Sequence, residues 1–126
     1  AGRSMDLVSI TEEYYEFVRE LRMNPLVQGG FLEEAQISKE AQEKYMATYK
    51  QDYYVCLLYD IPVGYIGVLD DDIRFCTHPE YQGRGVGSYM LREVKKLYPN
   101  ATGRIKKDNI PSQRVFDKAE ISYTLI

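Results

Sequence analysis

Residues that cross-link or bind metals in small proteins are scarce in this chain. Its 126 residues include two cysteines, Cys56 and Cys76, one histidine, His78, and no tryptophan. Two cysteines outside a CxxC pair are too few for a disulfide framework. One histidine leaves no multi-histidine metal site. We therefore expect neither a disulfide-stapled scaffold nor a bound metal.

Long apolar runs are also missing. The longest, residues 53–59, has seven residues, whereas a membrane-spanning helix needs about 20. No charged-then-apolar leader is present, so we expect a cytoplasmic protein with no membrane partner. Residues 1–4 are expected to be a cloning remnant ahead of an initiator Met5. The rest, residues 5–126, has the length and composition of a single globular domain.

Charge is divided unevenly along the chain. The net charge is −3, but residues 1–63 carry 6 basic against 11 acidic residues, and residues 74–118 carry 10 basic against 4 acidic ones. The acidic half favours a cationic partner and the basic segment an anionic one. The basic residues form no dense run, so we expect no nucleic-acid partner and favour a small polyphosphate ligand.

Hydrophobic periodicity and turn residues predict a mixed α/β (α+β) protein in the order β-αα-βββ-α-β-α-β. Short connections between the three central strands indicate an antiparallel meander, so we expect a mostly antiparallel sheet flanked by helices. The expected strands are residues 7–10, 53–59, 63–69, 73–77, 102–105 and 121–125. The first expected helix is capped by Thr11 and stops at Asn24-Pro25, with Tyr14, Phe17, Val18 and Leu21 inward. The second follows a Gly29-Gly30 loop and is capped by Ser38, with Ala41, Tyr45 and Tyr49 on one side. The third has Val86, Met90, Val94 and Leu97 inward, and the fourth spans residues 111–118.

A glycine-rich stretch lies between an expected strand and an expected helix, with the sequence Gln82-Gly83-Arg84-Gly85-Val86-Gly87-Ser88. Glycines allow several consecutive amides to point at one anion, and the helix adds its positive end. The alternative is a glycine-rich turn without a ligand, but the basic segment favours phosphate. A P-loop would need a Gly-Lys pair, and a dinucleotide fingerprint would need glycine where Ser88 stands. Neither nucleotide motif is therefore present.

The same residues resemble a known family. Thr77-His78-Pro79-Glu80-Tyr81 followed by the glycine-rich stretch resembles motif A of the GNAT N-acetyltransferase superfamily. Downstream, residues 109–119 resemble the family segment N-x-x-S/A-x-x-x-Y/F-x-K-x-G-F, and the element order agrees over residues 5–126. The resemblance implies transfer of an acetyl group from acetyl-CoA to a primary amine.

It also implies cofactor-binding residues. Backbone groups of Phe75, Cys76 and Thr77 would align the pantetheine arm of acetyl-CoA, and Asn109 and Ser112 would contact the arm or the adenosine. The motif A residues that would hold the pyrophosphate are Gln82, Gly83, Arg84, Gly85, Val86, Gly87 and Ser88.

Two departures from the family pattern are visible. Phe116 stands where members often carry a tyrosine that protonates the departing CoA thiolate, and the resemblance places this position among the cofactor-binding residues. The chain also shows one final strand where many members have two, so a homodimer partner would complete the acceptor-side wall. An acyl-CoA-binding domain without catalysis is therefore an alternative to the enzyme.

Catalytic and acceptor residues are suggested by the same resemblance. Some members place an acidic residue before motif A, which corresponds to Asp71, although an aspartate turn exposed to solvent is equally expected there. His78 is expected to be a solvent-exposed loop residue and Cys76 a packing residue.

For the acceptor, Arg22 and Asn24 lie in a phrase resembling one found in members that act on amino-sugar nucleotides or on protein N-termini. We rank a small-molecule amine on an amino-sugar nucleotide first. A protein N-terminus or a polyamine, which the acidic half favours, follows.

Overall fold

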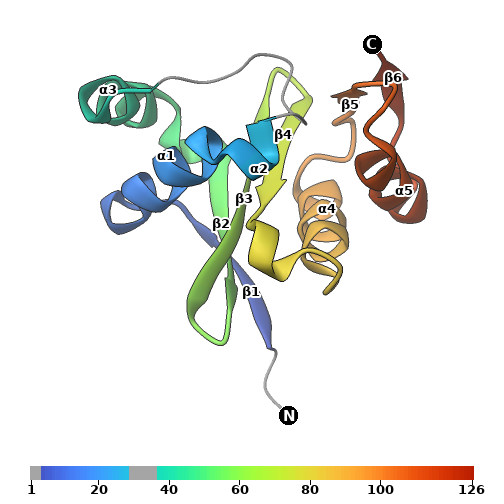
Figure 1. The fold of residues 1–126 in the computed structure, drawn as a ribbon. Coiled ribbons are helices and arrows are strands. Elements are labelled where there is room, and N and C mark those ends of the chain that lie inside the picture. The colour runs from blue at the N-terminus through green and yellow to red at the C-terminus, as the bar shows by residue number, and fades with distance from the viewer. Residues whose placement is uncertain (1–3, 29–36) are drawn as a thin grey trace.

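The computed structural model describes residues 4–28 and 37–126. Within them the elements follow the expected order, except that a short extra helix, Pro25–Gln28, lies where a loop was expected, and short 3-10 turns are added (Figure 1). The strands are β1 (Met5–Ser9), β2 (Tyr53–Leu58), β3 (Ile61–Leu69), β4 (Asp72–Thr77), β5 (Gly103–Ile105) and β6 (Tyr123–Leu125). The helices are α1 (Tyr15–Met23), α2 (Pro25–Gln28), α3 (Lys39–Tyr49), α4 (Val86–Leu97) and α5 (Ile110–Ala119). The expected Gly29-Gly30 loop and residues 1–3 lie outside the described residues.

Strands β1 to β4 form an antiparallel sheet in chain order, which confirms the expected meander. Two-residue turns join β2 to β3 and β3 to β4. Tyr59 and Asp60 have φ of 48° and 68°, and Asp70 and Asp71 have φ of 51° and 60°. Positive φ at both central residues is the type I′ geometry, whose twist suits a hairpin. Asp72 consequently begins β4 and does not belong to the turn.

The two faces of this sheet carry different apolar clusters, because side chains alternate along each strand. Val55 and Tyr65 belong to a cluster with residues of α1, α2 and α3. Cys56 and Ile66 belong to the other cluster, with residues of α4 and α5. Helices α1 and α2 cross one face of the sheet, and α4 lies beside β4 (Figure 1). The sheet is therefore covered by helices on both faces.

Strands β5 and β6 form a separate parallel pair, joined by α5. This pair connects to the main sheet at one point, where the amide of Ile73 donates to the Thr102 carbonyl and the amide of Thr102 donates to the Asp71 carbonyl, both at 2.8 Å. Beyond that point β4 has no described strand partner on this side. The two sheets therefore part from one another along β4.

The helix ends agree with the expected caps in one of two cases. The Ser38 hydroxyl accepts from the amide of Ala41 at 3.1 Å, as expected for the cap of α3. Thr11 makes no such bond; its hydroxyl donates to Glu13 Oε1 at 3.2 Å, and a 3-10 turn precedes α1. Thr11 therefore occupies the predicted N-cap position, but its side chain makes no capping hydrogen bond.

The inward face of α3 differs from the prediction. Gln42 and Met46 are buried, whereas Ala41 and Tyr49 are exposed. The buried face of α3 is therefore shifted by about one residue from the expected face, because the long Met46 side chain fills the core between α1 and the sheet.

In α4, Val86, Met90 and Val94 are buried as predicted. Leu97 is 57% exposed, and Leu91 takes the expected core position. No helix in the part of the chain that the structure describes is long and apolar enough to cross a membrane.

A close contact between β5 and α5 gives a test of this packing. A Cβ at Gly103 would lie 2.4 Å from Cε2 of Phe116, whose ring is held between Phe75 and Tyr123. Gly103→Ala should therefore lower the free energy of unfolding by about 1–3 kcal/mol. Gly87→Ala is the matched control, because its Cβ meets nothing closer than 3.4 Å. Thermal melts that show equal stabilities for the two variants would contradict this packing.

Candidate functional site

A cleft of about 850 Å³ opens between β4 and the β5–α5 unit and extends to the N-terminus of α4. Of the predicted acceptor and catalytic residues, Arg22 lines it, whereas Asn24 and Asp71 do not. Nearly all predicted cofactor residues line it: Phe75, Cys76, Thr77, Gln82, Gly83, Gly85, Val86, Gly87, Ser88, Asn109, Ser112 and Phe116. Arg84 is the exception.

One wall of the cleft is the outer edge of β4. In an antiparallel ladder, alternate residues direct their backbone groups to opposite sides. The amide of Ile73 bonds outward to Thr102, and the amide of His78 bonds inward to Val63. By this alternation the backbone groups of Phe75 and Thr77 point outward into the cleft. Those of Cys76 point toward Tyr65 on β3, so only two of the three predicted residues offer their main chain.

The far end of this wall is the first turn of α4. Gly83 and Gly85 have φ of 79° and 83°, a conformation that glycine adopts without strain. The first intrahelical bond runs from the amide of Tyr89 to the Gly85 carbonyl. The preceding amides therefore have no acceptor within the helix and lie at its positive end. This part of the cleft is suited to an anion.

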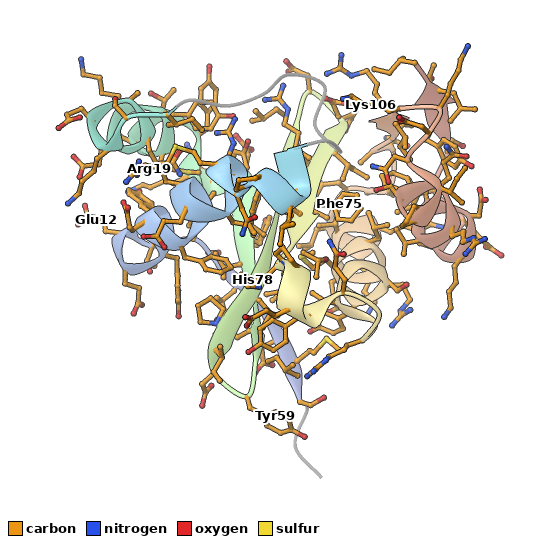
Figure 2. All side chains as sticks on the ribbon, in the orientation of Figure 1. Glu12, Arg19, Tyr59, Phe75, His78 and Lys106 are labelled. Carbon is orange, nitrogen blue, oxygen red and sulfur yellow. The ribbon has the colours of Figure 1, made fainter. Side chains whose placement is uncertain are left out.

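Gly87 brings the helix close to the cleft floor. A Cβ at this position would contact Cε2 of Phe75 at 3.4 Å and Cγ1 of Val115 at 3.9 Å. Phe75 lies between β4 and α4 in Figure 2. Any larger side chain at position 87 would therefore project into the cleft between Phe75 of β4 and Val115 of α5.

The Arg84 side chain lies outside the cleft lining. Its guanidinium carbon is 5.3 Å from the centroid of the Tyr81 ring, a cation–π contact on the surface of the loop. The sequence correctly predicts that Arg84 lies in the glycine-rich loop. It does not predict that the side chain contacts Tyr81 and does not line the cleft.

Asn109 and Ser112 are brought together at the start of α5. The Asn109 Oδ1 accepts from the amide of Ser112 at 3.3 Å and so caps the helix. Both residues also line the cleft. The motif that suggests a cofactor contact thus also has a local structural function.

Phe116 is 1% exposed and packs against Phe75 and Tyr123, with ring centroids 5.7 Å away in each case. Its ring edge lies over Gly103, where no side chain intervenes. The residue is therefore part of the core below the cleft, and it has no proton to donate.

The other end of the cleft, toward α1 and α2, carries arginine and tyrosine side chains. The hydroxyls of Tyr45 and Tyr53 are 2.7 Å apart, and Arg74 Nη1 donates to the Tyr45 hydroxyl at 3.4 Å. A Cβ at Gly67 would lie 2.5 Å from the Tyr53 ring, so glycine lets that ring lie across β3. The Arg22 guanidinium carbon is 6.0 Å from the Tyr45 ring centroid.

Burial sets the protonation of these phenols. It raises the pKa of Tyr53 and of Tyr65 well above the usual range, and the hydrogen bond between the Tyr53 and Tyr45 hydroxyls adds to the shift at Tyr53. Both phenols are neutral at physiological pH, so neither acts as a base there. Sequence analysis missed Tyr53, Tyr65 and Arg74 as site residues, although strand alternation places Arg74 and Cys76 on one face.

The aspartates of the β3–β4 turn have different surroundings. Asp71 is exposed on the turn. Asp72 lines the cleft, and its carboxylate accepts from Arg104 Nη2 at 2.9 Å and from Arg104 Nε at 3.3 Å. Arg74 Nε is 3.6 Å from the same carboxylate. The structure thus brings Asp72, and not Asp71, to the cleft.

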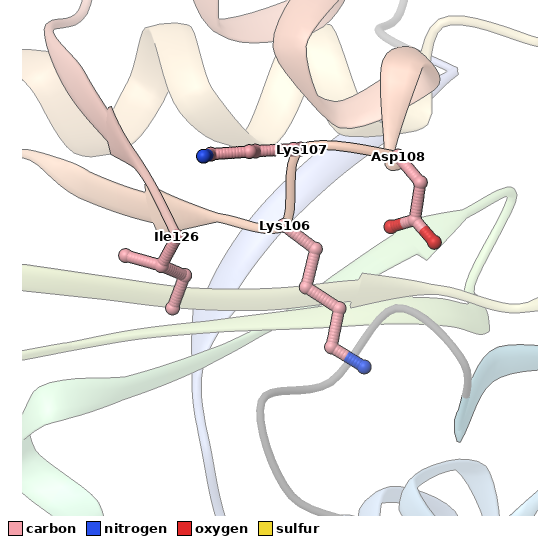
Figure 3. Close-up of a pocket in the computed structure, with 4 residues that line it drawn as sticks. All are labelled: Lys106, Lys107, Asp108 and Ile126. Atoms are coloured by element: carbon pink, nitrogen blue, oxygen red, sulfur yellow. The ribbon is translucent and has the colours of Figure 1, made fainter.

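Two other features are separate from this cleft. His78 accepts from the amide of Glu80 through Nδ1 at 3.1 Å and stabilises the turn before the glycine loop. A second hollow of about 420 Å³ is lined by Lys106, Lys107, Asp108 and Ile126, and Figure 3 shows the two lysine side chains pointing away from each other. The two cations do not converge on one ligand position.

The family follows from a match between this sequence and a protein-family model. A family model described as "Acetyltransferase (GNAT) domain" matches residues 49–120, more than half of the chain. The chain belongs to the GNAT acetyltransferase family. The predicted family, the fold class and an acyl-CoA-dependent N-acetyltransferase are thereby confirmed. No curated protein is significantly similar to the chain in sequence.

Solved structures agree with the GNAT fold. A domain from Methanocaldococcus jannaschii has a TM-score of 0.78 and 21% identity, covering 92% of this chain and 86% of its own. Spermidine N-acetyltransferase from Vibrio cholerae, in complex with CoA and spermine, has a TM-score of 0.80 and 13% identity. The match covers 92% of this chain and 79% of that enzyme's chain. The ribosomal-protein alpha-N-acetyltransferase RimL, in complex with CoA, has a TM-score of 0.77 and 14% identity. The match covers 94% of this chain and 80% of the RimL chain.

Cys76 is the one residue in this GNAT cleft whose chemistry invites a covalent step. Burial raises the pKa of its thiol to about 12, so the nucleophilic thiolate is almost absent at neutral pH. Across the described residues, no group of three or more His, Cys, Asp and Glu side chains is placed to hold a metal ion. The raised pKa therefore disfavours a covalent step through the Cys76 thiol.

The neutral Cys76 thiol is testable by alkylation. In a Cys56→Ala variant, which leaves Cys76 as the single thiol, iodoacetamide at pH 8 should react on the order of a thousandfold more slowly than with the same variant unfolded. The reaction should accelerate only as the pH approaches 12, the pKa of the buried thiol. Mass spectrometry over time measures both rates, and folded and unfolded rates within tenfold of each other would refute the assignment.

Proposed function

We propose that this GNAT chain transfers an acetyl group from acetyl-CoA, bound along β4, to the primary amine of a small molecule. The observation that carries the proposal is the outer edge of β4, which beyond Asp72 pairs with no strand in the described part of the chain. It leads directly to the first amides of α4, which have no acceptor within the helix. A pantetheine arm is an extended chain with amide groups, so it can bond to that edge as an added strand would. The pyrophosphate then reaches the positive end of the helix.

The cofactor orientation follows from the direction of β4. Thr77 is at the α4 end of the strand, and Asp72 is about 17 Å away at roughly 3.4 Å per residue. The thioester lies at the end of the arm opposite to the pyrophosphate, toward Asp72 and Arg74. Arg114 and Lys118 of α5 also line the cleft and supply positive charge for the phosphates. Arg84, on the exposed loop, is proposed to approach from outside.

In the transfer itself, the amine nitrogen attacks the thioester carbonyl carbon. A carbon–nitrogen bond forms, the carbon–sulfur bond breaks, the nitrogen loses a proton and the CoA sulfur gains one. Orientation of the two substrates supplies much of the acceleration, and outward amides of β4 polarise the carbonyl. Phe116 cannot donate the proton that the sulfur gains, so that proton comes from another group or from water.

Several acceptors are compatible with the family. The Vibrio cholerae structure contains spermine, and RimL acts on a ribosomal protein. For this chain, we keep the amino-sugar nucleotide as the first candidate, since Arg22 lines the acceptor end. Asn24 has a local function instead: its Oδ1 accepts from the amide of Leu26 at 2.9 Å. A homodimer that completes the acceptor wall stays a prediction.

A second candidate, an acyl-CoA-binding domain without turnover, is favoured by the burial of Phe116. The two functions separate in one assay, release of free CoA thiol with a panel of amines. Binding of acetyl-CoA without thiol release for any amine would favour the second candidate.

Binding of acetyl-CoA should raise the melting temperature, since a ligand at 100 times its Kd contributes about 2.7 kcal/mol. Gly87→Glu should abolish this shift, because the carboxylate would project into the cleft and repel the pyrophosphate. It should leave the unliganded protein folded, because an acid in the first turn of a helix is favourable. Gly87→Gln, of the same size but neutral, should retain more of the shift. A full shift in Gly87→Glu would place the ligand elsewhere.

Asp71 lies on the exposed turn, so it can act on an amine in the cleft only through an ordered water. If it does, Asp71→Asn lowers kcat/KM at neutral pH, and the loss shrinks as the pH approaches the pKa of the amine. Asp70→Asn is the matched control, because asparagine suits positive φ at either turn position. Identical pH–rate profiles for the two variants would exclude Asp71 as the base.

A further inference from the structure

The acceptor end of the cleft is cationic, although the N-terminal half of the chain is acidic. Arg22, Arg74 and Arg104 line it there. Among the cleft residues that the structure describes, Asp72 is the one carboxylate. The acidic residues of the N-terminal half that the structure describes do not line the cleft, so their charge says little about the acceptor.

Asp72 is already engaged. It receives two bonds from Arg104, at 2.9 Å and 3.3 Å, and Arg74 Nε is 3.6 Å from it. The side chain of Asp72 is 22% exposed, against 50% for Arg104 and 47% for Arg74. A carboxylate shared by two guanidinium groups is a poor counter-ion for an ammonium group. The arginines, in contrast, keep exposed surface.

Arg74 is held in place while its side chain stays 47% exposed at the cleft. Its Nη1 donates to the Tyr45 hydroxyl at 3.4 Å, and that hydroxyl is 2.7 Å from the hydroxyl of Tyr53. A guanidinium group has five N–H donors, and the contacts to Asp72, Tyr45 and Tyr53 engage some of them. The tyrosine pair thus fixes the guanidinium and leaves other donors at the cleft.

We propose that the acceptor amine carries an anionic group, phosphate or carboxylate, in the same molecule and that Arg74 binds this group. This inference rests on the proposed acetyl transfer and narrows its substrate class. A planar guanidinium next to neutral phenols binds such oxyanions in a defined geometry. A polyamine has no group for Arg74 and would be repelled by the arginines, so it is a poor substrate.

Matched acceptors test the proposal through kcat/KM. Glucosamine 6-phosphate and glucosamine share one amine and differ by a phosphate; 4-aminobutyrate and butylamine differ by a carboxylate; spermidine is the polycation. We expect at least one anionic member to exceed its partner by at least about tenfold, consistent with a charged hydrogen bond. Whether the phosphate or the carboxylate pair shows the effect identifies the group.

Substitution of Arg74 makes the test specific. Arg74→Gln should reduce the preference for the anionic member, measured as the ratio of the two kcat/KM values within a pair, by about tenfold to a hundredfold. The thermal shift with acetyl-CoA should not change. Arg92→Gln, on the exposed side of α4, is the charge-matched control and should behave as the parent. Equal values within both pairs, or preferred turnover of spermidine, would overturn the proposal while leaving acetyl transfer intact.

If thiol release fails for every amine, the proposed function fails, and binding still tests the inference. Inorganic phosphate and acetate are then titrated into the protein saturated with CoA. Binding of one of them that Arg74→Gln weakens and Arg92→Gln does not supports the anion site. Absence of such binding overturns it.

Discussion

The structure depends on the point at which β4 and β5 stop pairing. Two backbone hydrogen bonds at Thr102 join the strands, and the ion pair between Asp72 and Arg104 lies at the same point. Beyond it the outward backbone groups of β4 have no strand partner. Exposed strand edges are normally covered or blocked in proteins because they attract other chains. Here the edge is long enough, and close enough to a helix N-terminus, to pair with a ligand instead.

Much of the fold was predictable because it rests on local signals. The meander follows from short acidic turns, and the cap of α3 follows from Ser38. The glycine-rich loop was found because positive φ at Gly83 and Gly85 demands that residue type. Such features depend on a few neighbouring residues and their allowed backbone conformations.

The rest required contacts between distant segments. The sequence cannot show that Arg84 turns to Tyr81, or that Asp72 is shared by two arginines. The charge of the acceptor end is the clearest case. Counting acidic residues over the N-terminal half suggested a cationic acceptor, yet Asp72 is the one carboxylate among the described residues that line the cleft, and α1 places Arg22 there. Side-chain direction, not composition, sets the local field.

The contact between Gly67 and the Tyr53 ring has a consequence for how acceptor choice can diverge among similar chains. Any side chain at position 67 would lift the phenol off β3 and disturb the hydroxyl pair with Tyr45 that orients Arg74. The edge of β4 and the first turn of α4 would not be touched. A substitution at this one position in the middle of the sheet would therefore alter the proposed contact between Arg74 and the acceptor molecule, whereas the proposed binding site of acetyl-CoA would be retained. Substrate preference in this architecture can evolve by steric change alone.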